Sequence, residues 1–231
     1  MSFRELNLFP KEVLTILRVG IPCGVNGVVF SIANVILQST INTWGDMTIA
    51  GAAASDSITN ISYQVLSAFY TATMTFSGQC YGAGKIRRIR KLLLCSTGLC
   101  MGIMACVAIL ATVIPHTLIG IFNTNPEVLR AGTEKLLIVS WGYVLYASCE
   151  TLMGCLRGMR KNVAPTIINI GCACILRVIW VAFIYPLYPE VWFLYFCYII
   201  SYITSLGIML PYYFVCIRHL EREHTDIAPA N

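Results

Sequence analysis

Charged residues are scarce in this sequence, and their scarcity excludes an ordinary soluble domain. Asp, Glu, Lys and Arg together make up 12% of the 231 residues, about half the share that soluble proteins carry. Hydrophobic residues make up 57% of the chain, and its mean hydropathy is +0.72. The composition therefore predicts a polytopic, all-α membrane protein whose first partner is the lipid bilayer.

Histidine is also scarce, and the cysteines do not form a metal-binding pattern. None of the three histidines lies in an apolar segment, and no Cys-x-x-Cys pair occurs among the eleven cysteines. Most of the cysteines lie inside apolar runs, where Cys serves as a small buried residue. An enzyme acting on lipid head groups needs clustered Asp, His or Cys, whereas His116, His219 and His224 are scattered. The sequence therefore predicts no metal, no cofactor and no enzymatic activity.

Six apolar segments are long enough to cross a membrane, because a helix needs roughly 20 apolar residues to span the ~30 Å hydrocarbon core. These predicted spans form a transmembrane lobe over residues 19–217 and cover 19–41, 49–78, 92–114, 136–156, 164–185 and 191–216. Residues 1–18 alternate apolar and charged side chains, which predicts an amphipathic arm on the inner membrane surface. Residues 218–231 form a polar cytoplasmic tail that we expect to be disordered from Glu221.

Lys and Arg outnumber Asp and Glu by 16 to 11, and they lie mainly on alternate connections. The net charge is +5, but the cations lie at span ends and not in an aromatic-flanked stripe, which argues against a nucleic-acid partner. Lys and Arg are retained on the cytoplasmic side of membranes. They are missing from the connections after spans one, three and five, and only Arg130 and Lys135 break the pattern. We therefore expect a multi-pass protein of the cell membrane with both termini in the cytoplasm.

Polar side chains recur at helical spacing in the first two spans. Asn34 and Gln38 share a face of the first span, and Asp56, Asn60 and Gln64 share a face of the second. In lipid, such side chains must face the bundle interior or water. They either bond one helix to another, at roughly 0.6 kcal/mol each, or line a hydrated cavity. The length of the stripe favours a cavity, with Asp56 hydrated at its outer mouth.

Two further ionisable residues lie inside the spans. Glu150 precedes Arg157 by seven residues, which places it about 10 Å inside the cytoplasmic boundary. Loss of water there favours the protonated carboxyl, as a proton carrier requires, and Tyr146 lies one turn away as a hydrogen-bond partner; a neutral structural Glu is the alternative. Arg177 pairs with an acid, binds an anionic group or extends outward to the membrane surface, and we expect the last.

Glycines spaced four apart occur near two span ends. Gly98 and Gly102 lie in the third span, and Gly154 and Gly158 close the fourth. Small residues at this spacing allow two helices to approach closely. Both pairs therefore predict close packing between helices.

The residues at several span ends resemble a transporter family. Gly20-Ile21-Pro22 opens the first span, Gly78-Gln79 and Gly82-Ala83-Gly84-Lys85 with a basic run close the second, and Leu156-Arg157-Gly158 closes the fourth. In this order they resemble the C-terminal half of a multidrug and toxic-compound extrusion (MATE) transporter, over about residues 11–219. The resemblance implies one of two six-helix lobes of the MOP superfamily. It also implies export of a small cationic or amphipathic substrate through a central cavity, by antiport against a proton or sodium ion.

The chain departs from this family in two respects. We expect its N-terminal lobe to be absent, and the first span has no acidic residue, whereas the sodium-coupled branch places one there. Glu150 is therefore the leading candidate for ion coupling. A lone lobe would turn Asn34, Asn60 and Gln64 toward lipid, so we expect a second lobe, either another copy of the chain or a separately encoded N-terminal half.

Other interpretations remain open at this point. A lipid-linked sugar flippase of the same superfamily would favour several cations lining the cavity for a diphosphate, and Arg177 alone is available. A non-transporting membrane subunit, or the product of a truncated gene, would use the same fold without transport. A strictly monomeric chain without drug efflux would favour these last two.

Overall fold

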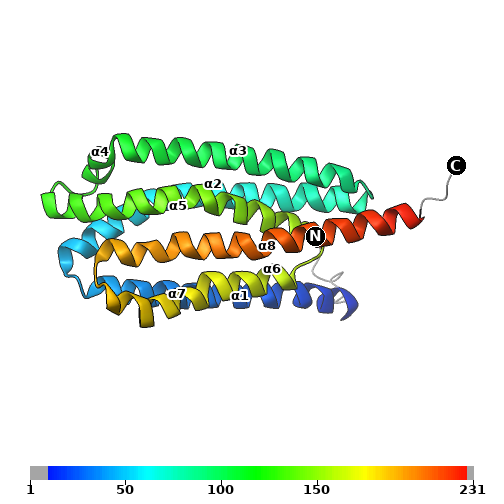
Figure 1. Cartoon of the computed structure of the whole chain (residues 1–231), viewed down its shortest axis with the longest axis horizontal. Coiled ribbons are helices and arrows are strands. Elements are labelled where there is room, and N and C mark those ends of the chain that lie inside the picture. Colours follow the sequence, from blue (N-terminus) through cyan, green and yellow to red (C-terminus); the bar gives the residue numbers. More distant parts are fainter. Residues whose placement is uncertain (1–9, 228–231) are drawn as a thin grey trace, which may run out of the picture.

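The computed structural model describes residues 10–227, and within that range the chain is helical apart from short connections (Figure 1). The long helices lie side by side in one bundle. In chain order the α-helices are α1 (Pro10–Asn42), α2 (Asp46–Gly82), α3 (Ile86–Val113), α4 (Pro115–Gly120), α5 (Pro126–Gly158), α6 (Val163–Asn169), α7 (Leu176–Ile179) and α8 (Val191–Ile227). The predicted all-α fold is confirmed, and each predicted span overlaps one long helical segment.

The helices extend beyond the predicted spans at both chain ends. Residues 1–9 of the predicted arm lie outside the described residues, and residues 10–18 form the first turns of α1. At the other end α8 continues past Pro211 to Ile227, so the disorder expected from Glu221 is wrong up to that residue. An ion pair of 3.0 Å between Arg90 of α3 and Glu221 ties this part of α8 to the bundle.

A short helix, α4, lies in a connection for which the sequence predicted no helix. Ile114 precedes a proline, which disfavours the α conformation, and its backbone takes φ −129° and ψ 47°. The α3 helix therefore ends at Val113, and Pro115 starts α4 at the position where a helix tolerates proline best. Asn125 then caps α5, since its side chain accepts a hydrogen bond of 3.0 Å from the Glu127 amide.

The basic connections gather at one end of the bundle. In Figure 1, α1 begins and α8 ends at the end that also carries the α2–α3 and α5–α6 turns. Gly84 makes the α2–α3 turn with φ 69°, a conformation that favours glycine. Apolar side chains of α3, α5 and α8 fill the bundle near this end, among them the fully buried Ile89, Leu156, Met159 and Ile217. This packed core and the basic connections thus share one end of the bundle.

Glycines set the close contact between α2 and α5. A Cβ added to Gly51 would lie 2.7 Å from the amide nitrogen of Gly132, and one added to Gly154 would lie 2.6 Å from the Tyr70 carbonyl oxygen. The predicted packing role of Gly154 and its neighbour Gly158 is confirmed. For Gly98 and Gly102 the prediction is wrong, because an added Cβ on either would meet nothing within 4 Å in the described chain.

The fifth helical segment is not a regular α-helix. π-helical turns, Ile170–Ile175 and Trp180–Ile184, flank the single α turn of α7, and a 3-10 turn, Tyr185–Leu187, ends the segment. A π turn widens the helix and leaves backbone groups less regularly bonded. Ser201 of α8 donates a hydrogen bond of 2.7 Å to the Cys172 carbonyl within the first π turn. Arg177 thus lies on the one α turn between two widened ones.

Four helical segments of the described chain are long and apolar enough to cross a membrane. They are α3, α5, residues 163–187 and α8 as far as Arg222. The α1 helix is apolar over the shorter stretch Gly27–Asn42, and α2 carries the polar stripe that lowers its hydropathy. Together with their parallel arrangement in Figure 1, these helices define a multi-pass membrane protein.

Candidate functional site

A cavity of about 350 Å³ lies between α1, α2, α5 and α8. Of the residues predicted to form a site, it is lined by Asn34, Gln38, Asp56, Asn60 and Tyr146. The polar faces of the first two spans therefore do meet across one space. The rest of the lining is largely aromatic, with Phe30 from α1, Tyr63 from α2, Tyr143 from α5, and Tyr198 and Tyr202 from α8.

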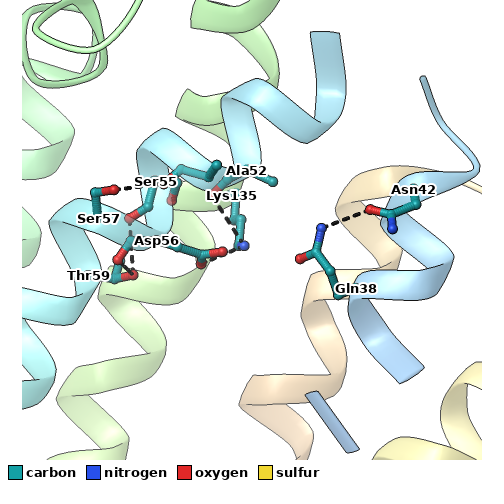
Figure 2. A network of polar contacts seen from close by, with 9 residues as sticks. Gln38, Asn42, Ala52, Ser55, Asp56, Ser57, Thr59 and Lys135 are labelled. Carbon is teal, nitrogen blue, oxygen red and sulfur yellow. Dashed lines mark hydrogen bonds and ion pairs between the residues drawn. The ribbon is translucent and has the colours of Figure 1, made fainter. Parts of the chain in front are cut away.

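Lys135 is the charged cavity residue that sequence reasoning missed. Its side chain is 4% exposed and forms an ion pair of 2.6 Å with Asp56, which is 47% exposed. Figure 2 shows Lys135 reaching from α5 to Asp56, with Gln38 and Asn42 of α1 nearby and joined to each other by a hydrogen bond of 3.0 Å. Asp56 is therefore not simply hydrated, since a buried ammonium holds it at the cavity wall.

Glu150 lies behind the cavity wall and not in it. It is 6% exposed, and it accepts a hydrogen bond from the hydroxyl of Tyr146 on its own helix. Because Tyr146 lines the cavity, one hydroxyl group connects the buried carboxyl to it.

Arg177 contradicts the expectation that it extends outward to the membrane surface. It is 1% exposed, and its guanidinium lies 4.4 Å from the ring centre of Tyr198, 5.6 Å from that of Tyr202 and 5.4 Å from that of Phe30. A guanidinium over aromatic faces gains cation–π attraction, so the interior can hold the side chain without an acid. All three rings also line the cavity.

Gln64 lies on an exposed face of α2, outside the cavity. This uncovered polar face of α2 comprises Ser57, Asn60, Gln64, Thr71 and Thr75, all exposed, and of these Asn60 also lines the cavity. Three of its hydroxyl groups donate to carbonyl oxygens of α2 itself: Ser57 to Ala53 at 3.0 Å, Thr71 to Ser67 at 2.9 Å, and Thr75 to Thr71 at 2.9 Å. The face is thus polar in composition, with much of its bonding capacity used inside the helix.

Fold and site together define a helical, multi-pass membrane protein with a polar and aromatic cavity between its helices. Comparison with known proteins identifies the family. The MatE family model matches residues 22–183, and the chain belongs to this family of multidrug and toxic-compound extrusion proteins.

Curated relatives are named as multidrug resistance proteins. The chain is 23% identical over 167 residues to the probable multidrug resistance protein YoeA of Bacillus subtilis, and the match covers 72% of this chain and 36% of that protein. It is 24% identical over 154 residues to the probable multidrug resistance protein NorM of Thermotoga maritima, covering 67% of this chain and 33% of the relative.

Solved transporter structures share the fold. A crystal structure of MATE in complex with MaL6 superposes with a TM-score of 0.85 at 17% identity, and an outward-facing multidrug resistance MATE transporter of the MOP superfamily with 0.84 at 18%. Each match covers 96% of this chain and 50% of the solved one. The chain thus spans half the length of the transporters whose fold it shares.

Proposed function

We propose that this chain is one lobe of a drug exporter in the cell membrane, with both termini in the cytoplasm. In this proposal it exports small cationic or amphipathic molecules by antiport against a proton or a sodium ion. The carrying observation is the hydrogen bond between buried Glu150 and Tyr146, a residue of the cavity wall. This bond links the cavity to a buried carboxyl group, that of Glu150, whose charge can change.

The coupling follows from electrostatics. An ionised Glu150 attracts a substrate cation into the cavity, because charges interact more strongly where water is excluded. Uptake of an ion neutralises the carboxylate and removes that attraction, so that substrate is released. A proton or a sodium ion can each do this, and Tyr146 keeps the carboxyl oriented toward the cavity in either case.

A second lobe completes the exporter in this proposal. The exposed amides of Asn60 and Gln64 on α2 cannot be satisfied by lipid tails, and the solved relatives are twice as long as the matched region. The partner is either a second copy of the chain or a separately encoded N-terminal half. A flippase for lipid-linked sugars ranks behind, because the pairing of Lys135 with Asp56 leaves few free cations for a diphosphate.

The experiment is efflux of a fluorescent organic cation from inverted or right-side-out vesicles, measured against pH and against sodium. Glu150→Gln keeps the shape of the side chain but cannot ionise, so efflux driven by an ion gradient should fall to the level of empty vesicles. Glu134→Gln is the matched control, because Glu134 pairs with the exposed Arg130 and should behave as the native chain. Undiminished, gradient-dependent efflux in Glu150→Gln would remove Glu150 from the mechanism.

A further inference from the structure

The end of the bundle that carries the α2–α3 and α5–α6 turns has a large excess of positive charge on its surface. The exposed cations described there are Lys85, Arg87, Arg88, Arg90, Lys91, Arg160, Lys161, Arg218 and Arg222. Among the side chains described at this end, Glu221 alone is acidic, and it pairs with Arg90. At the opposite end the exposed side chains include the acids Asp46, Glu127 and Glu190. The basic end therefore attracts anions, whereas the opposite end exposes several acids.

An ion pair marks the place where α3 and α8 approach each other at the basic end. It joins Arg90 of α3 to Glu221 of α8 at 3.0 Å. On α3, Arg87, Lys91 and Leu94 follow one another at i, i+4 and i+7, so they share a face beside Arg90. All three are exposed, and none of the ion pairs in the described chain includes Arg87 or Lys91. Two cations without a counter-ion thus lie within two turns of an exposed apolar side chain.

The face of α8 beside Glu221 repeats this arrangement. Phe214, Arg218 and Glu221 follow one another at i, i+4 and i+7. Phe214 and Arg218 are both exposed, and no ion pair among the described residues includes Arg218. Leu94 of α3 and Phe214 lie inside helical stretches that are apolar enough to cross a membrane, Ile86–Val113 and Val191–Arg222. Each helix therefore places cations near its basic end and an apolar side chain one turn deeper in the membrane.

We propose that an anionic phospholipid binds at the α3–α8 seam, which consists of Arg87, Lys91, Leu94, Phe214 and Arg218. The charged head group pairs with the three cations of the seam, and the acyl chains lie against its two apolar side chains. Clusters of Lys and Arg next to membrane spans attract anionic lipids, and basic sites between such helices bind their head groups. A zwitterionic lipid also carries a phosphate, but its ammonium is repelled by the same cations.

The apolar part of the seam favours a lipid over a soluble polyanion. A nucleic acid or an acidic protein would meet the cations, but it would leave Leu94 and Phe214 uncovered. A phospholipid has charge and hydrocarbon in the order in which the two helices present their partners. The inference goes beyond the proposed transport function and does not depend on it, since it uses only the surface of a multi-pass membrane protein.

The test measures lipid binding to the purified, delipidated full chain in detergent micelles. Dioleoylphosphatidylglycerol and dioleoylphosphatidylcholine have the same acyl chains and differ in the charge of the head group. Native mass spectrometry gives the dissociation constant of the first bound molecule of each lipid. The native chain should bind the phosphatidylglycerol about tenfold more tightly, because nearby Lys and Arg favour the anionic head group. Glycerophosphoglycerol, which has the head group but no acyl chains, should bind at least tenfold more weakly than the intact anionic lipid.

Neutralising the seam should remove this preference. In the triple variant Arg87→Gln, Lys91→Gln and Arg218→Gln, the two lipids should bind within about twofold of each other. The matched control loses three exposed cations of the same end that lie outside the seam, through Arg88→Gln, Arg160→Gln and Lys161→Gln. It should keep a preference within about twofold of the native one. Helix content and elution volume establish that each variant is folded, and Lys91→Gln with Arg218→Gln carries the test if the triple variant is not.

Three results would overturn the inference. Equal binding of the two lipids by the native chain would show that the head-group charge is not recognised. An equal loss in the seam variant and in its matched control would mean that the basic end attracts lipid diffusely. Binding of glycerophosphoglycerol as tight as that of the lipid would exclude the apolar contacts. No substrate or ion gradient is present, so efflux can fail while the lipid preference persists, and the reverse.

Discussion

Lys135 and Arg177 are buried basic residues that the bundle stabilises in different ways. Lys135 has a carboxylate partner in Asp56 at 2.6 Å, and its ammonium also lies 3.4 Å from the Ala52 carbonyl oxygen. Arg177 has no ion pair among the described residues, and its guanidinium lies over three aromatic rings. The guanidinium tolerates this because it is more weakly hydrated than an ammonium. Exchanging the two residue types would therefore not be conservative at either position.

The Lys135–Asp56 pair predicts an asymmetric effect of substitution on stability. Asp56→Asn leaves the buried ammonium without its counter-ion and should lower the free energy of unfolding by about 3 kcal/mol. Lys135→Met removes the buried charge and leaves Asp56 half-exposed to water, so it should cost less than about 1 kcal/mol. Unfolding in mixed micelles with increasing SDS measures both. Equal losses would mean that the ion pair does not determine the stability of this region.

Helical spacing alone was enough to predict most of the polar cavity residues. Asn34, Gln38, Asp56 and Asn60 repeat at the period of a helix, and they do face one space. Lys135 was missed because hydropathy places the start of the fourth span after it, whereas α5 begins at Pro126. A charged residue just outside an apolar run indicates the end of a span. Only the packing of α5 against α2 shows that Lys135 is buried.

At the scale of elements, α2 and α5 approach each other so closely that several contact positions require glycine. Gly51, Gly132 and Gly154 each leave no room for a side chain against the facing helix. Without a hydrophobic driving force between helices in lipid, such close approach is a main source of packing energy. The third helix has a glycine pair of the same spacing that faces no neighbour.

Two glycine-to-alanine substitutions should therefore change the stability of the chain in opposite directions. Gly154→Ala places a Cβ 2.6 Å from the Tyr70 carbonyl oxygen and should destabilise the chain by about 1–3 kcal/mol, the usual cost of overpacking. Gly98→Ala enters open space and should stabilise it by up to about 1 kcal/mol, because alanine is the better helix former. Unfolding in SDS-containing micelles checks both. A Gly154→Ala chain as stable as the native one would contradict the described helix contact.

The irregular fifth segment could not be predicted from the sequence. Its residues are mostly apolar, so the hydropathy pattern is the same for an α-helix and for a π turn. The departure depends on tertiary contacts, such as the hydrogen bond from Ser201 to the Cys172 carbonyl. The same holds for Arg177, whose burial depends on rings supplied by α1 and α8.

At the scale of the whole molecule, the uncovered polar face of α2 is what the described chain leaves incomplete. Exposed leucine or phenylalanine is expected where helices meet lipid tails, and α3 shows it with Leu94 and Leu99. Asn60 and Gln64 on α2 are exposed as well, and lipid tails cannot hydrogen-bond them. The proposed second lobe would cover this face of α2, whereas α3 would face lipid.

Native mass spectrometry of the chain, purified from the cells that produce it, should detect this lobe as a second copy or as a different chain. Gln64→Trp should weaken the association by about tenfold, because a large side chain on the uncovered polar face of α2 overpacks the contact. Leu99→Trp, on the lipid-facing side of α3, is the matched control and should leave it unchanged. A chain that is monomeric in native form, or equal effects of the two variants, would rule out the assigned face.

In the proposed two-lobe exporter, the hydroxyl groups of α2 would form few bonds to the second lobe. Ser57, Thr71 and Thr75 already donate to carbonyl oxygens of their own helix, so a neighbour that shifts along α2 breaks few bonds to them. Such a surface is polar enough to contact water but forms few hydrogen bonds to a neighbouring helix. In the proposed exporter, the two lobes would therefore slide past each other along α2 at a low energetic cost.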